Sequence, residues 1–264
     1  MVLSARQKYY IKQVVFHVLS PFYHEKRKKL FEAQREKGVH NIPIFIISYN
    51  RLSYLSNIIH QLEQRGFQNI KIIDNCSDYP PLLEYYKKTE YEVFRLQKNL
   101  GHKAFWTDPV FDQYRKNFYV MTDPDLEIDE NCPNDFLEKF FELLWKFPYA
   151  RKVGFSLKID DIPDNVPWKK EIVEWEEQYH KIRNSRYNAF YAGIDTTFAL
   201  YVPDDIVYTN DFVSAFRTEY PYEVRHLPWY KSPDEITEED KYYSSHKTNG
   251  WWDVTKGCMI PDEQ

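Results

Sequence analysis

The sequence predicts an α/β fold, with a mostly parallel, mixed central sheet flanked by helices and preceded by an N-terminal helical extension. Between residues 42 and 122, short apolar runs rich in β-branched residues alternate with segments of helical periodicity. Such alternation is typical of parallel strands joined by right-handed crossovers. The 264 residues suit one large α/β unit, and no repeat or low-complexity linker divides them. We therefore expect an extension over residues 1–40 and one domain over residues 41–264.

Residues 5–36 are expected to form a helix. Tyr10, Val14, Val18 and Phe22 follow each other at i, i+4 spacing, although Pro21 should break or kink the run. Residues 1–38 contain nine Lys and Arg and three Glu, a net charge of +6. This pattern favours a packing helix with a solvated basic end. A contact with an anionic membrane surface, or a role in dimerisation, stays open.

The next segments alternate between helical periodicity and the apolar, β-branched runs that are typical of strands. Residues 49–66 carry a helical stripe of leucine and isoleucine that ends at Gly66, a good C-terminal cap. Further helices are expected at 80–88, where proline suits the start, and less certainly at 104–114, which Pro109 interrupts. The expected strands are 42–48, 69–74, 91–96 and 118–122.

The second half is less regular. Helices are expected at 134–148, with Asn134 or Asp135 as N-cap, and at 166–180. Strands or extended segments are expected at 152–158, 196–202, 212–218 and 222–230, followed by a polar tail.

Composition narrows the class of function. The chain has only 7 Gly and neither of the common Gly-rich phosphate motifs. Its overall charge is −5, so residues 39–264 carry −11, which argues against nucleic acid as the main partner and suits a divalent cation. Three cysteines without C-x-x-C spacing favour reduced thiols. With no secretory or membrane-spanning pattern, a cytoplasmic location is expected, at the inner face of the membrane if residues 1–38 bind lipid.

Polar residues follow the first four predicted strands. The clusters are SYNR after the first, DNCSD after the second, QKNLGH after the third and DPD after the fourth. Because ligands bind at the carboxyl ends of parallel strands, these clusters predict a cleft. Asp123 and Asp125 flank Pro124 there, and carboxylate oxygens suit Mg²⁺ or Mn²⁺. A solvated turn with a capping aspartate is the alternative for this pair.

Four segments in this order resemble the nucleotide-sugar-binding segments of family 2 glycosyltransferases, which have the GT-A fold. They are IPIFIISYNRLSYL, IIDNCSD, QKNLGH and MTDPDLEI. The resemblance covers residues 42–130 well and the remainder loosely. It implies a nucleotide-sugar-binding half at 41–130, an acceptor-binding half at 131–264, and Mn²⁺ or Mg²⁺ as cofactor.

The resemblance also implies roles for single residues. The donor, most commonly a UDP-sugar in this family, would be bound by Ser48, Tyr49, Asn50, Arg51, Asp74, Asn75, Ser77, Lys98, Asn99, Gly101 and Asp123. Asp125 would bind the metal, and Asp123 would contact the ribose or the metal through water. His226 would complete the metal shell, although a structural histidine is equally compatible with the sequence.

Inverting transfer needs a general base for the acceptor hydroxyl. Asp195, in the stretch YAGIDTTFALY, is the best candidate, although this stretch departs from the commoner Glu-Asp pair of the family; Asp211 and Glu219 are alternatives. Trp229 and Tyr230 would offer a stacking platform for the acceptor, or belong to the core.

The resulting hypothesis is a metal-dependent inverting glycosyltransferase that moves a sugar from a nucleoside-diphosphate donor to a glycan hydroxyl, in surface polysaccharide or glycoconjugate synthesis. A sugar-nucleotide nucleotidyltransferase is less favoured, because the first loop lacks a Gly-rich basic signature. A catalytically degenerate module that binds glycans or nucleotides is the third possibility.

Overall fold

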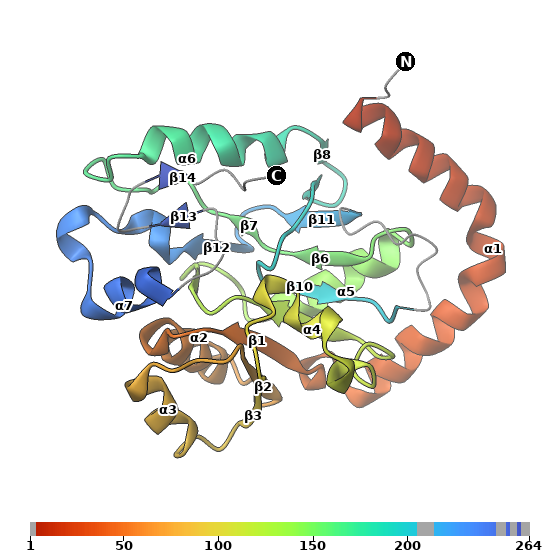
Figure 1. The fold of residues 1–264 in the computed structure, drawn as a ribbon. Helices are drawn as coiled ribbons and strands as arrows, with labels where there is room; N and C mark the ends of the chain where they lie inside the picture. The colour runs from red at the N-terminus through yellow and green to blue at the C-terminus, as the bar shows by residue number, and fades with distance from the viewer. Residues whose placement is uncertain (1–3, 205–213, 247–251, 254–257, 260–264) are drawn as a thin grey trace.

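The computed structural model describes residues 4–204, 214–246, 252–253 and 258–259. Its centre is a nine-stranded sheet with the order β3-β2-β1-β4-β10-β6-β11-β9-β8 (Figure 1). The strands are β1 (Ile44–Ser48), β2 (Ile70–Asp74), β3 (Glu92–Arg95), β4 (Tyr119–Thr122), β6 (Lys152–Gly154), β8 (Arg183–Asn184), β9 (Ala189–Tyr191), β10 (Ala199–Tyr201) and β11 (Ala215–Thr218). The predicted α/β class is thus confirmed.

The sheet is mixed rather than mostly parallel. β1, β2, β3 and β4 pair in parallel, as expected, and β6 is parallel to β11. The other four described pairings, which involve β10, β9 and β8, are antiparallel. The expectation of a mostly parallel sheet therefore holds for the first half of the chain. It fails for the second half, where most of the short strands pair in antiparallel orientation.

Both faces of the central strands are covered. In β1, Ile44 and Ile46 belong to one core cluster and Phe45 and Ile47 to the other, because successive side chains point to opposite faces. The larger cluster includes side chains of α2 (Leu52–Gln64) and α5 (Phe136–Lys146). The smaller includes side chains of α4 (Ala104–Thr107) and of the 3-10 turn Pro109–Phe111. Two-sided burial explains the continuous apolar runs in the sequence.

A smaller sheet crosses the end of the main one. It has the order β5-β12-β7 and consists of β5 (Leu126–Ile128), β12 (Glu223–His226) and β7 (Ser156–Leu157). The single strand expected at 152–158 is therefore wrong: it divides at Phe155 into β6 and β7, which belong to different sheets. β5 was not expected, and a third sheet pairs β13 (Trp252–Asp253) with β14 (Cys258–Met259).

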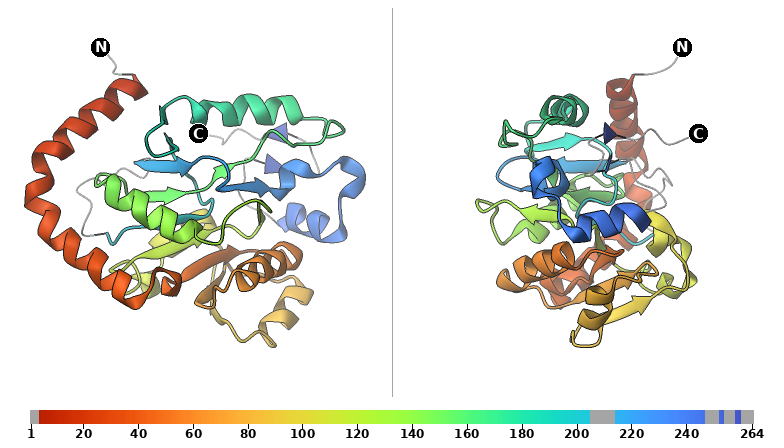
Figure 2. Two further views of the ribbon diagram at one scale, coloured as in Figure 1. Left: turned by 180° about the vertical axis from the view of Figure 1, so that it is seen from behind. Right: turned by 60° about the vertical axis from the view of Figure 1, so that its left-hand side comes forward.

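The N-terminal helix α1 (Ala5–Lys37) is continuous through Pro21 and curves along one side of the body (Figures 1 and 2). Of the break or kink expected at Pro21, the break is absent and the helix curves instead. Tyr9 packs against Tyr191 and Phe216 near one end of the helix, and Phe31 packs against Phe118 near the other. The extension is therefore attached to the domain at both ends.

The remaining helices are α3 (Pro80–Tyr86), α6 (Lys169–Glu176) and α7 (Glu238–His246). The first two were expected. α7 lies in the stretch expected to be a polar tail, and it packs beside α2 (Figure 1).

Candidate functional site

The predicted polar clusters meet at one edge of the sheet. β1 pairs in parallel with β2 on one side and with β4 on the other, so the segments after Ser48, Asp74 and Thr122 leave the sheet together. The strand order 3-2-1-4 reverses direction between β1 and β4. Ligands bind at such a reversal in open α/β sheets. The geometry therefore agrees with the edge of the sheet at which the sequence places the candidate site.

Asn50 organises the loop after β1. Its backbone is in the left-handed region, with φ 51°, which asparagine tolerates better than most residues. Its side-chain oxygen accepts hydrogen bonds from the backbone of Asp78 at 2.9 Å and of Tyr79 at 3.0 Å, and its amide donates to the Asp78 carboxylate at 2.9 Å. Its backbone N–H donates to Ser77 Oγ at 2.9 Å. Asn50 thus joins the loops after β1 and β2.

Asn75 organises the next loop in the same way. Its amide donates to Asn99 Oδ1 at 2.8 Å and to the Gly101 carbonyl at 3.1 Å, and its oxygen accepts from the Leu100 backbone at 2.7 Å. Gly101 has φ 66°, a conformation that strains residues with a Cβ. The loop after β3 is therefore shaped by a side chain at the end of β2.

Asp74 is satisfied from within the protein. Its carboxylate accepts the Ser77 backbone N–H at 3.1 Å, the Tyr86 hydroxyl at 3.3 Å and Arg95 Nε at 3.0 Å. These bonds compensate a carboxylate with no exposed surface. In this conformation Asp74 holds neighbouring loops together and presents no surface to a ligand.

Most residues that were expected to touch the donor are buried, as Asp74 is. Six are at most 5 % exposed: Ser48, Asn50, Arg51, Asp74, Asn75 and Ser77. Tyr49, Asn99, Gly101 and Asp123 are partly exposed, and Lys98 is exposed. The structure therefore divides the predicted residues into those that are buried in the loops and those that keep exposed surface.

Asp125 lies between the side chains of Arg51 and His226. Its Oδ2 is 3.5 Å from Arg51 Nη1 and 3.6 Å from His226 Nε2. The antiparallel pairing of β12 with β5 sets His226 opposite Leu126, which brings the imidazole to its place beside Asp125. Burial by itself raises the pKa of Asp125, but His226 and Arg51 together hold that pKa below its ordinary value. Asp125 is accordingly a carboxylate at neutral pH.

Asp123 faces the second half of the chain. Its carboxylate accepts a hydrogen bond from the Thr196 hydroxyl, and its backbone N–H donates to the Thr196 carbonyl at 3.0 Å. Burial, and then the charge of Asp125, raise the pKa of Asp123 to about 8. Asp195, adjacent to Thr196 and exposed, is thereby placed beside the DPD turn.

Three buried charged residues that were not predicted from the sequence hold the Asp195 loop. Lys152 Nζ donates to the Asp195 carbonyl at 3.1 Å, and Arg217 Nε donates to the Gly193 carbonyl at 2.7 Å. Arg217 is paired with Glu176, which is 1 % exposed. Burial lowers the pKa of Lys152 to about 7 and raises that of Glu176 to about 7. No local motif marks these residues, because they meet only across strands and α6.

A divalent cation fits part of this arrangement. Two buried polar atoms, Asp125 Oδ1 and His226 Nδ1, have no hydrogen-bond partner among the described residues. Buried polar atoms are seldom left unpaired, and carboxylate oxygen and imidazole nitrogen are ligands for Mn²⁺. However, the described part of the chain contains no group of three or more His, Cys, Asp or Glu gathered as metal ligands. Asp123 is instead turned to Thr196.

Helix α7 packs over the loop after β1 and the start of α2. The Tyr49 hydroxyl donates to the His246 carbonyl at 2.9 Å, and the Arg51 guanidinium lies 3.9 Å from the centre of the Tyr243 ring. The Glu239 carboxylate accepts the backbone N–H groups of Leu52 and Ser53 at the start of α2. Helix α7 was not predicted from the sequence, because its first turn is acidic and it has no apolar stripe.

The remaining predicted residues have other partners. Trp229 is 8 % exposed and packs edge-on to His226, which favours the core over a stacking platform. The Tyr230 hydroxyl donates to the Lys158 carbonyl and lies 2.7 Å from Asp161 Oδ1. Glu219 forms a paired contact with Arg183, and Asp211 lies outside the described residues.

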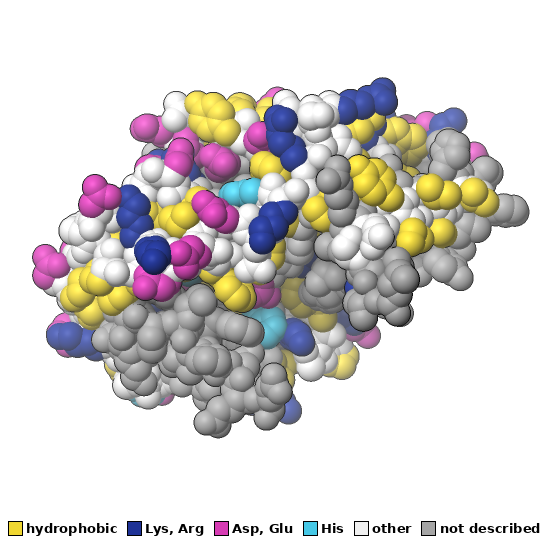
Figure 3. All heavy atoms as spheres, turned by 90° about the horizontal axis from the view of Figure 1, so that it is seen from above, with side chains coloured by type: hydrophobic (Ala, Val, Ile, Leu, Met, Phe, Trp, Pro, Cys, Tyr) yellow, Lys and Arg dark blue, Asp and Glu magenta, His cyan; other side chains and the backbone are white. Residues whose placement is uncertain are grey.

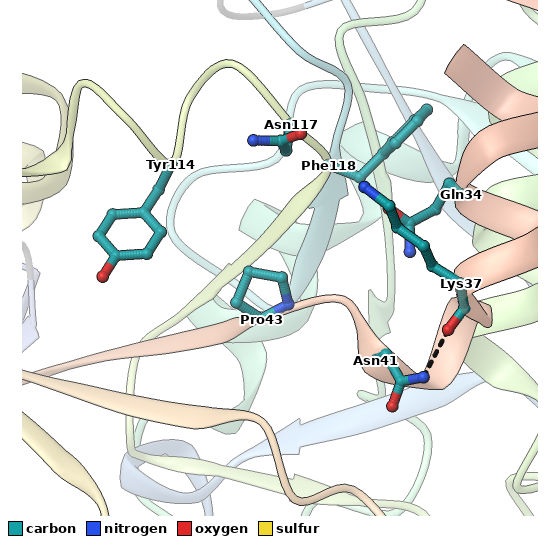
Figure 4. Close-up of a pocket in the computed structure, with 7 residues that line it drawn as sticks. All are labelled: Gln34, Lys37, Asn41, Pro43, Tyr114, Asn117 and Phe118. Atoms are coloured by element: carbon teal, nitrogen blue, oxygen red, sulfur yellow. Dashed lines mark hydrogen bonds between the residues drawn. The ribbon is translucent and has the colours of Figure 1, made fainter. Parts of the chain in front are cut away.

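A cavity of about 250 Å³ lies elsewhere, at the opposite edge of the sheet (Figure 4). It is lined by Gln34, Lys37, Asn41, Pro43, Tyr114, Asn117 and Phe118. Pro43 directly precedes β1 and Phe118 directly precedes β4, so the cavity is at the amino ends of strands whose carboxyl ends form the candidate site. It contributes nothing to that site.

Comparison with protein-family models and with curated proteins found no match for this chain.

Proposed function

We propose that the chain is a metal-dependent inverting glycosyltransferase that transfers a sugar from a nucleoside-diphosphate donor, most simply a UDP-sugar, to a hydroxyl of a glycan. The observation that carries the proposal is the junction of Asp123 with Thr196. This junction joins the DPD turn at the edge of the parallel half-sheet to the loop that carries an exposed carboxylate, Asp195.

Each group has a role in this scheme. Asp123, Asp125 and His226 would hold Mn²⁺ or Mg²⁺, which when bound neutralises the charge that develops on the leaving diphosphate. Asp195 accepts the proton of the acceptor hydroxyl. Lys152 and Arg217 fix the backbone of the Asp195 loop, so the base is positioned by buried contacts rather than by its own side chain.

Donor binding tests the proposal. A panel of nucleoside diphosphates and their sugars is titrated into the full chain, with and without Mn²⁺, and binding is followed by calorimetry. We expect one nucleoside diphosphate to bind only with the metal, and Asp125→Asn to weaken that binding more than about tenfold. Asp195→Asn should bind the donor normally but lose donor hydrolysis. Asp112→Asn, a surface change whose carboxylate is 58 % exposed, is the matched control.

The outcomes separate the alternatives. Metal-dependent binding without any turnover, in the unaltered chain, would favour a degenerate binding module. The covering helix α7 and the burial of Arg51 against Asp125 are compatible with that function. Release of pyrophosphate when a nucleoside triphosphate and a sugar 1-phosphate are added together, with transfer of the nucleotidyl group to the sugar phosphate, would favour a nucleotidyltransferase. If no nucleotide binds with Mn²⁺, the proposal is wrong.

A further inference from the structure

The N-terminal half of α1 carries an apolar face that no described part of the chain covers. Tyr10, Ile11, Val14, Val15 and Val18 are each between 44 % and 65 % exposed. In the same stretch the helix packs on the body through Tyr9, which is 7 % exposed. The exposed residues are therefore not a fraying end. The helix begins at a capping box of Ser4 and Gln7, so the face belongs to a formed helix.

The five side chains form one stripe. At 100° per residue they span an arc of about 140°, which is the width of an apolar face that is meant to be buried. Figure 3 shows hydrophobic side chains gathered along the part of the surface that α1 forms. Exposed Lys8 borders this stripe. Exposed apolar patches rimmed by polar residues mark interaction sites.

The charge of the segment indicates the partner. Residues 1–22, which include the stripe, contain three Lys and Arg and no Asp or Glu, a charge of +3, while residues 39–264 carry −11. An anionic lipid surface attracts the first and repels the second, so it selects this side of the molecule. A symmetric pair of chains joined through the stripe would instead bring two segments of +3 together.

The stripe is suited to lying on a membrane and not to crossing one. Within the described residues, none of the helices combines the length and the apolar character that a membrane span requires. A helix with one apolar face and flanking basic residues lies in the plane of the interface, with its apolar side chains at the boundary of headgroups and acyl chains.

We propose that the stripe Tyr10, Ile11, Val14, Val15 and Val18, bordered by Lys8 in a segment of net positive charge, docks the protein on the surface of an anionic lipid bilayer. The apolar side chains enter the interface, and the positive charge of the segment orients the molecule. This inference stands whether or not the protein is a glycosyltransferase.

Vesicle co-sedimentation of the full chain tests it. The vesicles are pure phosphatidylcholine, or phosphatidylcholine with about 30 % phosphatidylserine. We expect binding to the anionic vesicles at about 0.1 M salt and its release at about 0.5 M salt, where screening shortens the reach of the charges. Val14→Glu should lower the partition coefficient at least about tenfold, because it removes apolar surface and adds repulsion.

Val110→Glu is the matched control. Val110 is 44 % exposed, lies in the 3-10 turn Pro109–Phe111 outside the stripe and gives the same change of charge, so this variant should bind as the unaltered chain does. Thermal melts verify that both variants fold. The inference is overturned by absence of binding to anionic vesicles, by equal loss in both variants, or by a dimer in analytical ultracentrifugation that Val14→Glu dissociates.

Discussion

The cap that Glu239 supplies to helix α2 gives the sharpest test of the structure. The N-cap residue of α2, Arg51, makes no side-chain capping bond. The carboxylate of Glu239 takes that place, accepting the N–H groups of Leu52 and of Ser53, the latter at 3.0 Å. A carboxylate there also interacts favourably with the helix dipole. Glu239→Ala should therefore weaken the contact between α7 and α2 and also destabilise α2.

The magnitude follows from the number and exposure of the bonds. Two hydrogen bonds to a partly exposed carboxylate contribute about 1–2 kcal/mol to the free energy of unfolding. A chain of this length unfolds with an entropy of roughly 0.55 kcal/mol/K, so the melting temperature should fall by about 2–4 °C. The assay is a thermal melt by circular dichroism, combined with hydrogen exchange at the amides of Leu52 and Ser53.

Glu238→Ala is the control from the same helical turn. Its side chain is 89 % exposed and pairs only with Lys241 among the described residues, so its loss should shift the melting temperature by less than about 1 °C. Faster exchange at Leu52 and Ser53 should appear in Glu239→Ala alone. Equal shifts in the two variants, with unchanged exchange, would refute the docking of α7 on α2.

Three further predictions concern the sheet and the Asp195 loop. Gly154→Ala should destabilise the fold by about 2–3 kcal/mol in urea unfolding, because its Cβ would lie 2.3 Å from the Phe198 carbonyl oxygen; a stable variant would contradict this packing. Lys152 has a pKa of about 7 when folded against 10.5 as its ordinary value, so unfolded chains bind more protons between these values. The contribution of Lys152 to stability should consequently rise with pH from 7 to 9, by up to about 1.4 kcal/mol per pH unit. It is measured as the difference in slope between the unaltered chain and Lys152→Met, because Asp123, with a pKa of about 8, contributes the opposite slope below pH 8 in both. Thr196→Val should cost about 1–2 kcal/mol of stability, since it leaves the Asp123 carboxylate without its hydroxyl donor, and an unchanged urea midpoint would argue against that bond.

The local pattern of the sequence was sufficient to predict the first half of the fold. The apolar runs of β1, β2 and β4 and the stripe of α2 are set by neighbours in the sequence, and burial on both faces of a parallel sheet makes such runs unmistakable. The gathering of polar loops at one edge followed from the same pattern. The short strands of the second half carry too little periodicity to fix their direction, so the antiparallel pairings of β10 and β9 were missed.

The sequence by itself determined the class of the fold, the edge at which Asp123 and Asp125 stand, and the charge of the N-terminal segment. Only the tertiary structure decided that β12 brings His226 to Asp125, that Thr196 meets Asp123 and that α7 closes over Tyr49. It also decided that α1 turns Tyr9 inward and leaves Val14 outward. The physical reason is that periodicity reports whether a residue is buried, whereas contacts between distant segments depend on how strands are paired and helices packed.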